Sequence, residues 1–343
     1  MNPSVFSRLP VELVRLILEA SGRDCSKSAA RLLRVSRLVH SWILPIVYET
    51  LVIDITSQRS LRACRDITRG WHMRFHPGPL SFFDSLKNIC LSTPNATGVA
   101  SYDVFGAVMA PGITRDQQQD ILCLFHDCTN ISNLYIDISL DNVSRSGTLS
   151  PKLGAFGLGG NLGTSLTHLH CGSWDAWMST SRYLADLPSL THLRIDVAYN
   201  TGIFGSFLPL VYRTHYLSRL SHFAVAFDSR SGPHELRGAA DFADSILRRP
   251  HIKSVVLMAW YCWETTRGRL LKIFGDATDP RLTILEMGGC ADVRESVKEW
   301  EAGVRGKGGI WNEVTQQKKG ENFSHLNQSE GIINQGGCNV SIV

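Results

Sequence analysis

The chain has 343 residues, of which 43% are hydrophobic and 19% are charged, and these are the proportions of a folded globular protein rather than a disordered one. Its formal net charge of +4 gives no overall electrostatic reason to expect nucleic acid or a membrane surface as a partner. No apolar run is long enough to cross a bilayer, and the N-terminus lacks the basic and apolar regions of an export signal.

The cysteines point to a reducing compartment. There are nine of them, an odd number, and they are scattered from Cys25 to Cys338, which is not the pattern of a disulfide framework. Because thiols are kept reduced in the cytosol and the nucleus, we expect a cytoplasmic or nuclear protein.

The first predicted element is a helix in "RLPVELVRLILEA", which runs from residue 8 to residue 20. Pro10 is tolerated at a helix start. Leu13, Leu16 and Ile17 fall three and four residues apart on one apolar face, which Val14 and Leu18 widen. This helix is predicted to end near Gly22. A second helix is predicted over 26–38, and "ETLVI" at 49–53 is typical of a strand.

Fifty residues are too few to bury so many apolar side chains on their own. These helices therefore need either a partner protein or the domain that follows them, which they would then only cap. The sequence alone leaves both alternatives open, although it favours the partner.

Residues 5–50 carry a recognisable set of short motifs. The set consists of Leu9-Pro10, Glu12-Leu13, Ile17-Leu18, Val35-Ser36-Arg37 and Trp42. This region resembles the F-box, in the form abundant in mushroom-forming fungi. The resemblance implies that the helices dock on a Skp-type adaptor protein and, through it, on a cullin-type ubiquitin ligase. The adaptor-binding residues that it implies are Leu9, Pro10, Leu13, Ile17, Leu18, Val35 and Trp42.

Residues 51–80 are predicted to be a linker or a connecting helix. Arginines recur in it at helical spacing, for example Arg62, Arg65 and Arg69, and such a charged row is typical of a solvated helix face. Nucleic acid is the less favoured explanation of this row.

Residues 81–302 contain a six-residue motif that is apolar at its first, fourth and sixth places. The seven copies begin at Leu86, Ile131, Leu166, Leu190, Leu220, Ile252 and Leu282. Helix-like segments separate them, so each unit is predicted to be a helix, a turn and a strand. Such units bury their apolar faces by stacking. The pattern resembles degenerate leucine-rich repeats. We therefore expect an α/β protein in which a small helical F-box-like module precedes a leucine-rich-repeat-like solenoid, with a parallel sheet and outer helices.

Alternation along each strand predicts which side chains face the concave side of the sheet. Places four and six point into the core, so places three and five line the concave surface. The predicted target-binding residues there are Asn133, Tyr135, His168, His170, His192, Arg194, His222 and Glu286. Three histidines on neighbouring strands are also possible zinc ligands, but we favour a by-product of the repeat and expect no metal or cofactor.

The remaining residues, 303–343, are rich in Gly, Asn and Gln and are predicted to be a disordered tail. The chain shows no catalytic motif of a hydrolase or metalloprotease. The resemblance to the F-box implies a non-catalytic substrate receptor of a Skp–cullin–F-box ubiquitin ligase, with an unknown protein as its target. The alternative is a stand-alone leucine-rich-repeat scaffold without a role in ubiquitin ligation.

Overall fold

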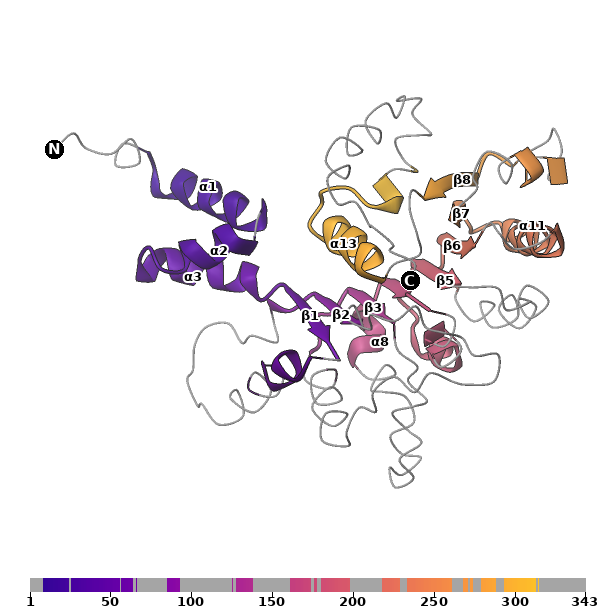
Figure 1. Ribbon diagram of the computed structural model, residues 1–343. Coiled ribbons are helices and arrows are strands. Elements are labelled where there is room, and N and C mark those ends of the chain that lie inside the picture. Colours follow the sequence, from indigo (N-terminus) through magenta and orange to yellow (C-terminus); the bar gives the residue numbers. More distant parts are fainter. Residues whose placement is uncertain are drawn as a thin grey trace, which may run out of the picture.

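The computed structural model of the protein has two visible parts, a group of N-terminal helices and a parallel sheet with helices on both sides (Figure 1). The residues that the structure describes are 9–24, 26–55, 57–63, 66, 85–92, 125, 128–137, 161–173, 176–177, 180–197, 218–228, 233–260, 268–270, 272–273, 279–287, 293–312 and 314. Within these ranges, none of the helices combines the length and the apolar character that a membrane crossing requires.

The first helix, α1 (Val11–Asp24), begins directly after Pro10, as predicted. The carbonyl of Pro10 accepts hydrogen bonds from the backbone N–H groups of residues 13 and 14, at 3.0 and 3.1 Å. The helix ends later than predicted, because Gly22 is not a terminator but a buried contact. Gly22 packs beside Ile43 of a neighbouring helix, and a Cβ atom there would lie 3.4 Å from that side chain, which is an ordinary packing distance.

The second predicted helix, 26–38, is two helices in the structure: α2 (Ser26–Leu32) and α3 (Arg37–Val47). The break follows from Ser36, whose Oγ accepts a hydrogen bond at 3.1 Å from the backbone N–H of Val39 and so caps α3. Pro45 lies inside α3, where it cannot donate to the carbonyl of residue 41, and the helix ends two residues later at Val47.

Eight parallel strands form one sheet, and each strand pairs with its neighbours in the sequence. They are β1 (Thr50–Asp54), β2 (Asn88–Ser92), β3 (Asn133–Ile136), β4 (His168–Cys171), β5 (His192–Val197), β6 (His222–Asp228), β7 (Ser254–Trp260) and β8 (Leu282–Met287). All seven predicted motifs are strands. The sheet begins at Thr50, so the boundary predicted at residue 81 is too late. This order is compatible with an α/β solenoid.

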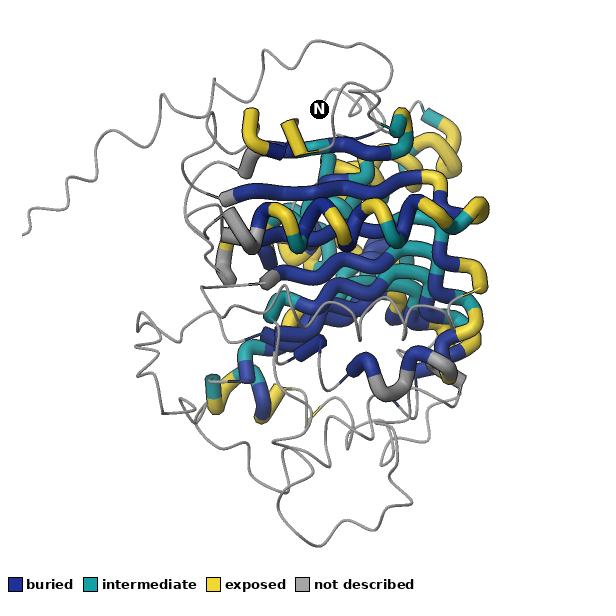
Figure 2. The backbone as a smooth tube through the Cα atoms, turned by 90° about the vertical axis from the view of Figure 1, so that its right-hand side faces the viewer, coloured by how far each residue is buried: buried dark blue, intermediate teal, exposed yellow. Residues whose placement is uncertain are grey.

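The main core lies on one face of this sheet. In the fourth motif, for example, Leu190, Leu193 and Ile195 at places one, four and six are all fully buried, as predicted. The 3₁₀ helix η3 (Ser181–Asp186) and the helix α11 (Pro233–Leu247) contribute side chains to the same core. Figure 2 shows the strands as buried tubes side by side, with exposed residues where the chain turns between elements.

The last strand departs from the predicted register. Leu282, at place one of its motif, pairs with Val255, which is at place four of the preceding motif. A shift of three residues exchanges the two faces of a strand. Glu286 therefore lies opposite Ala259, a member of the main core, and its predicted place on the concave surface is wrong.

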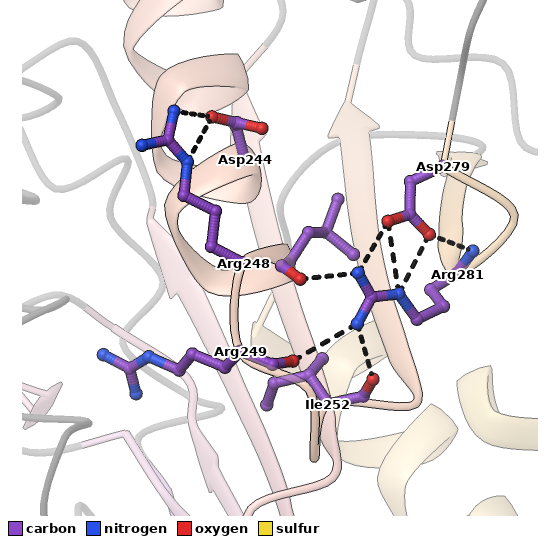
Figure 3. A network of polar contacts seen from close by, with 7 residues as sticks. Asp244, Arg248, Arg249, Ile252, Asp279 and Arg281 are labelled. Carbon is purple, nitrogen blue, oxygen red and sulfur yellow. Dashed lines mark hydrogen bonds and ion pairs between the residues drawn. The ribbon is translucent and has the colours of Figure 1, made fainter.

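Arg281, just before β8, accounts for this register (Figure 3). Its guanidinium donates to Asp279 at 2.7 Å and to the backbone carbonyls of Leu247, Arg249 and Ile252 at 2.5–3.2 Å. These carbonyls belong to the end of α11 and the turn into β7, and that of Arg249 also accepts a hydrogen bond at 3.2 Å from the backbone N–H of Ile252. The carbonyl of Arg281 in turn accepts a hydrogen bond at 2.9 Å from the backbone N–H of residue 255, which fixes where β8 starts.

The other face of the sheet is covered by the end of the described chain. Figure 1 shows the strands following one another in an arc, with α13 (Val293–Val304) on its inner side and α11 on its outer side. Beyond α13, Ile310 and Val314 are buried against apolar side chains of β6, β7 and β8. The disordered tail predicted from residue 303 is therefore wrong up to residue 314, because this strip of the inner face is apolar and needs a cover. Residues 315–343 lie outside the described part of the chain.

Candidate functional site

The N-terminal helices carry an apolar surface that no described residue of the chain covers. Six of the eight large hydrophobic side chains that are exposed among the described residues lie within residues 11–38, and they are 47–64% exposed. They are Val11, Leu13, Leu16, Ile17, Val35 and Leu38. Clusters of exposed apolar side chains on a small module indicate a binding surface, because isolated domains gain by burying them.

The predicted adaptor-binding residues divide into two groups. Pro10, Leu13, Ile17 and Val35 are exposed, and Leu9 is half-buried. By contrast, the half-buried side chains Leu18 and Trp42 pack against the core of the helical module itself. That core consists of Ala29, Val39, Ile43 and Ile46. Leu16 belongs to the apolar face predicted for this helix but not to the predicted adaptor-binding residues, and the structure leaves it 60% exposed, three residues after Leu13 on the same face.

The predicted concave surface faces the expected side of the sheet but is mostly covered. Tyr135, His170 and Arg194 are 0–5% exposed, so the prediction that they form an open surface is wrong. The cover is α13, whose Val297 and Trp300 pack against Tyr135 and its neighbour on β2. An apolar stripe on that helix is the physical reason, since it can be buried only against the sheet.

A buried group of charges joins α13 to the sheet. Arg194 on β5 donates to Asp196 at 2.8 Å through Nε and to Glu299 of α13 at 2.5 Å through Nη1. Asp196 also accepts a hydrogen bond at 2.8 Å from His170 Nε2 and one at 3.4 Å from Ser296. Each charge is thus paired at the base of the interface, which is the condition under which buried charges are tolerated.

The pKa values in this group are shifted by burial and by the pairing. Burial alone raises the pKa of Asp196, but Arg194 and His170 outweigh it, so the net shift is downward and Asp196 stays ionised. Burial lowers the pKa of His170 more than Asp196 raises it, so this imidazole is neutral at pH 7. The net pKa shift of Arg194 is upward, because Asp196 and Glu299 together outweigh its desolvation.

Beside this group, three histidines stack as a row across β4, β5 and β6. The ring centroids of His168 and His192 are 4.0 Å apart, and those of His192 and His222 are 4.2 Å apart, with interplanar angles of 13° and 7°. Trp311 of the C-terminal segment meets the rings of His192 and His222 edge-on, at 5.1 and 5.6 Å. The row therefore lies beneath the segment that the sequence predicted to be disordered.

The residue before each histidine fixes its tautomer. The hydroxyl of Thr167 donates to a backbone carbonyl at 3.0 Å, and that of Thr191 does so at 3.1 Å. Each hydroxyl hydrogen is thus in use, so at 2.9 and 2.8 Å the hydroxyl oxygens accept from Nδ1–H of His168 and His192. The remaining ring nitrogen, Nε2, then carries a lone pair. The sequence signal for this arrangement is a hydroxyl residue directly before each histidine, which recurs in Thr167-His168, Thr191-His192 and Ser221-His222.

His168 and His192 are neutral over the physiological range. Burial lowers the pKa of His168 to about 4, with a further contribution from His222. Burial and the two neighbouring rings lower the pKa of His192 to about 3, with a smaller contribution from Lys253. Parallel rings direct their nitrogens the same way rather than toward one point, and no group of metal ligands is found among the described residues.

A cavity of about 200 Å³ lies between this row and the C-terminal cover. Its polar walls include Asn133, His168, His192 and Glu299, and its aromatic walls are Trp300 and Trp311. Of the predicted target-binding residues, His170 and Arg194 also line it, whereas Tyr135 lies under α13.

Comparisons of the chain with protein-family models, with curated proteins and with solved structures found no match. Function must therefore be argued from two surfaces, the apolar one on α1–α3 and the polar cavity on the inner face of the sheet.

Three cysteines on or beside the sheet are buried: Cys90, Cys128 and Cys171. Burial raises the pKa of Cys90 to about 12 and also raises that of Cys171, so these two stay protonated at pH 7. Since only the thiolate is a good nucleophile, neither is suited to covalent chemistry.

Proposed function

We propose that the protein is a non-catalytic substrate-recognition subunit of a Skp–cullin–F-box ubiquitin ligase, in the cytoplasm or the nucleus. In this proposal the N-terminal helices bind a Skp-type adaptor and the sheet domain, with leucine-rich-repeat-like units, binds a target protein. The observation that carries the proposal is the exposure of Leu13 and Ile17 on α1, at 47% and 48%. The F-box-like motifs of residues 5–50 provide the identity of the partner.

A partner that buries the exposed apolar side chains of α1 removes their contact with water, which lowers the free energy. Fully burying one such side chain is worth about 1.5–3 kcal/mol, so a partner that covers the α1 face gains several such contributions. The module offers no internal alternative, because its own core already consists of residues from α2 and α3. A target protein would reach the inner face where the sheet is not sealed, at the cavity beside His168 and His192.

The experiment is co-purification of the full chain with a Skp-type adaptor. We expect the wild-type chain to recover the adaptor and a Leu13→Glu, Ile17→Glu double variant to lose it, because two carboxylates on this face oppose burial. Ile273→Glu is the matched control, since Ile273 is also exposed, at 41%, but lies far from residues 11–38 in the sequence. Equal recovery by the double variant and the wild type would rule the proposal out.

The scaffold alternative is supported by one contact. Lys307 of the C-terminal segment pairs with the side chain of Asp24 at the end of α1, at 2.7 Å, and also donates to its backbone carbonyl. The helical module is thus tied to the sheet domain. If it only caps that domain, a chain lacking residues 1–49 should melt at a lower temperature, and no adaptor should be recovered with the full chain.

A further inference from the structure

The cavity on the inner face has the size of one side chain. At about 200 Å³ it is smaller than the roughly 300–1,000 Å³ of sites for drug-sized ligands, and several times the ~30 Å³ share of one water molecule. This volume fits a small group better than a whole nucleotide or organic cofactor.

The walls present hydrogen-bond acceptors. His168 and His192 each use Nδ1–H on a neighbouring hydroxyl, and neither Nε2 has a hydrogen-bond partner among the described residues. Glu299 adds a carboxylate, of which Oε1 accepts from Arg194. Its side chain is 23% exposed, so the carboxylate is accessible from the cavity.

The charges at the cavity exclude an anion and favour a cation. The guanidinium of Arg194 is shared between Asp196 and Glu299, so it has no positive charge left over for a ligand. The charged lining residues are Arg194 and Glu299, and Asp196 lies buried beneath them, so this group of three has a formal charge of −1. The exposed Lys253 is the further charge that acts on His192. Trp300 and Trp311 add aromatic walls, which attract ammonium and guanidinium groups.

We propose that this cavity binds a single ammonium or guanidinium group. The two imidazole Nε2 atoms and the carboxylate of Glu299 accept its N–H donors, while the tryptophans cover its apolar stem. The group can belong to a lysine or arginine side chain of a bound protein or to a small free amine. The proposal does not rest on the adaptor-binding function, because it concerns only the inner face of the sheet.

The test uses the full chain, with n-butylammonium and methylguanidinium chlorides as cationic probes and sodium acetate as the anionic probe. Affinities are measured by calorimetry, and the histidine nitrogens are followed by long-range ¹⁵N–¹H spectra at pH 7. We expect a cation to shift the Nε2 resonances of His168 and His192, and acetate to leave them in place. Acetate binding as tightly as the cations, or cations that leave both Nε2 resonances unshifted, would overturn the proposal.

Two variants locate the site. Glu299→Gln is expected to weaken cation binding about tenfold or more, because it removes a charge-assisted hydrogen bond. Glu295→Gln removes the same charge from an exposed position of the same helix and is expected to leave affinity within about twofold. If Glu299→Gln fails to fold, His192→Phe retains the ring stack but removes one acceptor, and is expected to weaken binding severalfold. Unchanged affinity in either cavity variant contradicts the proposal.

The source of the cation is distinguished by comparing n-butylammonium with the blocked tripeptide Gly-Lys-Gly. An affinity for the peptide at least tenfold higher assigns the cavity to a protein side chain. Equal affinity assigns it to a free amine. Both results agree with the proposal, and failure to bind either probe does not. Adaptor recovery is measured separately, so the two proposals fail independently.

Discussion

Gly172, the residue after β4, leaves room for the aromatic ring of Tyr135. A Cβ atom at this position would lie 2.6 Å from Cζ of that ring and closer still to its hydroxyl oxygen, and both belong to a side chain that is fully buried. We therefore expect Gly172→Ala to lower the free energy of unfolding by roughly 1–3 kcal/mol, as overpacking in a core does. Urea unfolding followed by circular dichroism measures the change.

Gly268 is the matched control for this substitution. It is helical, and a Cβ there would meet no atom within 4 Å. Gly268→Ala should keep or slightly raise the free energy of unfolding, because alanine has the better helix propensity. Equal unfolding curves for Gly172→Ala and the wild type would show that the Tyr135 side chain can adopt another buried position at no cost in free energy.

His168 and His192 make the free energy of unfolding depend on pH. The pKa of His168 is lowered to about 4 and that of His192 to about 3, both from 6.5. As the pH falls through 6.5, His168 and His192 become protonated in the unfolded chain but stay neutral in the folded chain. The stability associated with these residues is therefore complete above pH 6.5 and is lost as the pH falls toward 4, by about 1.4 kcal/mol per pH unit for each histidine.

His192→Phe tests this linkage, because phenylalanine keeps the stack but does not titrate. Free energies of unfolding between pH 7.5 and pH 4.5 should fall less steeply for the variant, by about 1.4 kcal/mol per pH unit below 6.5. The same slope in both proteins would mean that His192 is protonated equally in the folded and unfolded chains.

At the scale of one element, the attachment of α13 depends on Arg194. Its guanidinium is 4% exposed and connects Asp196 of the sheet to Glu299 of the helix. Arg194→Met leaves the buried carboxylate of Asp196 without its cation, and we expect this to cost about 3–5 kcal/mol of unfolding free energy. Hydrogen exchange of the backbone amides of 293–304 should accelerate in the same variant.

Two comparisons make this result specific to the buried pair. Adding Asp196→Asn to Arg194→Met removes the stranded charge and should recover part of the loss. Lys298→Ala breaks only the exposed pair with Glu295 and should change stability by less than about 1 kcal/mol. If Lys298→Ala costs as much as Arg194→Met, burial of the charge is not the cause.

The end of α11 depends on the fork shape of the Arg281 guanidinium, which contacts three carbonyls and Asp279 at once (Figure 3). Lysine keeps the charge but cannot span these acceptors. We expect Arg281→Lys to lower the melting temperature and to speed amide exchange in the last turn of α11. Arg248→Lys, at the exposed pair with Asp244, is the control and should change neither quantity.

The sequence predicted elements well where the contacts are local. Apolar residues at three places of a repeated motif predicted seven strands, and the structure confirms them. The slip of β8 was not predictable, since it follows from Arg281 reaching carbonyls about thirty residues away. The break before α3 had a local signal in Ser36, a strong helix N-cap.

At the scale of the whole molecule, the exposed apolar residues of α1 were predictable and the covered inner face was not. The spacing of Leu13 and Ile17, four residues apart, predicts that both lie on one face of a helix. Whether a sheet face is open depends instead on which later segment packs on it. The low apolar content after residue 303 predicted no packing, yet Ile310 and Val314 in this segment are buried. The cavity exists only because that segment returns to the histidine row.

Truncated chains test whether residues 293–314 contribute to the stability and the solubility of the sheet domain. A chain that ends at residue 292 lacks α13 and the following segment, so Tyr135, Val256 and Met258 become exposed on the inner face. We expect it to bind a hydrophobic dye, to self-associate and to melt at a lower temperature, because an uncovered apolar face favours aggregation.

A chain that ends at residue 314 keeps every described contact of the inner face, and it should therefore behave as the full chain does in these three measurements. The comparison separates the cover from the residues that follow it, since the two truncated chains differ only by residues 293–314. If the shorter chain is monomeric, does not bind the dye and melts at the same temperature, α13 does not contribute to the stability or the solubility of the sheet domain. The paired charges of Arg194 and Glu299 would then contribute nothing to holding the sheet together.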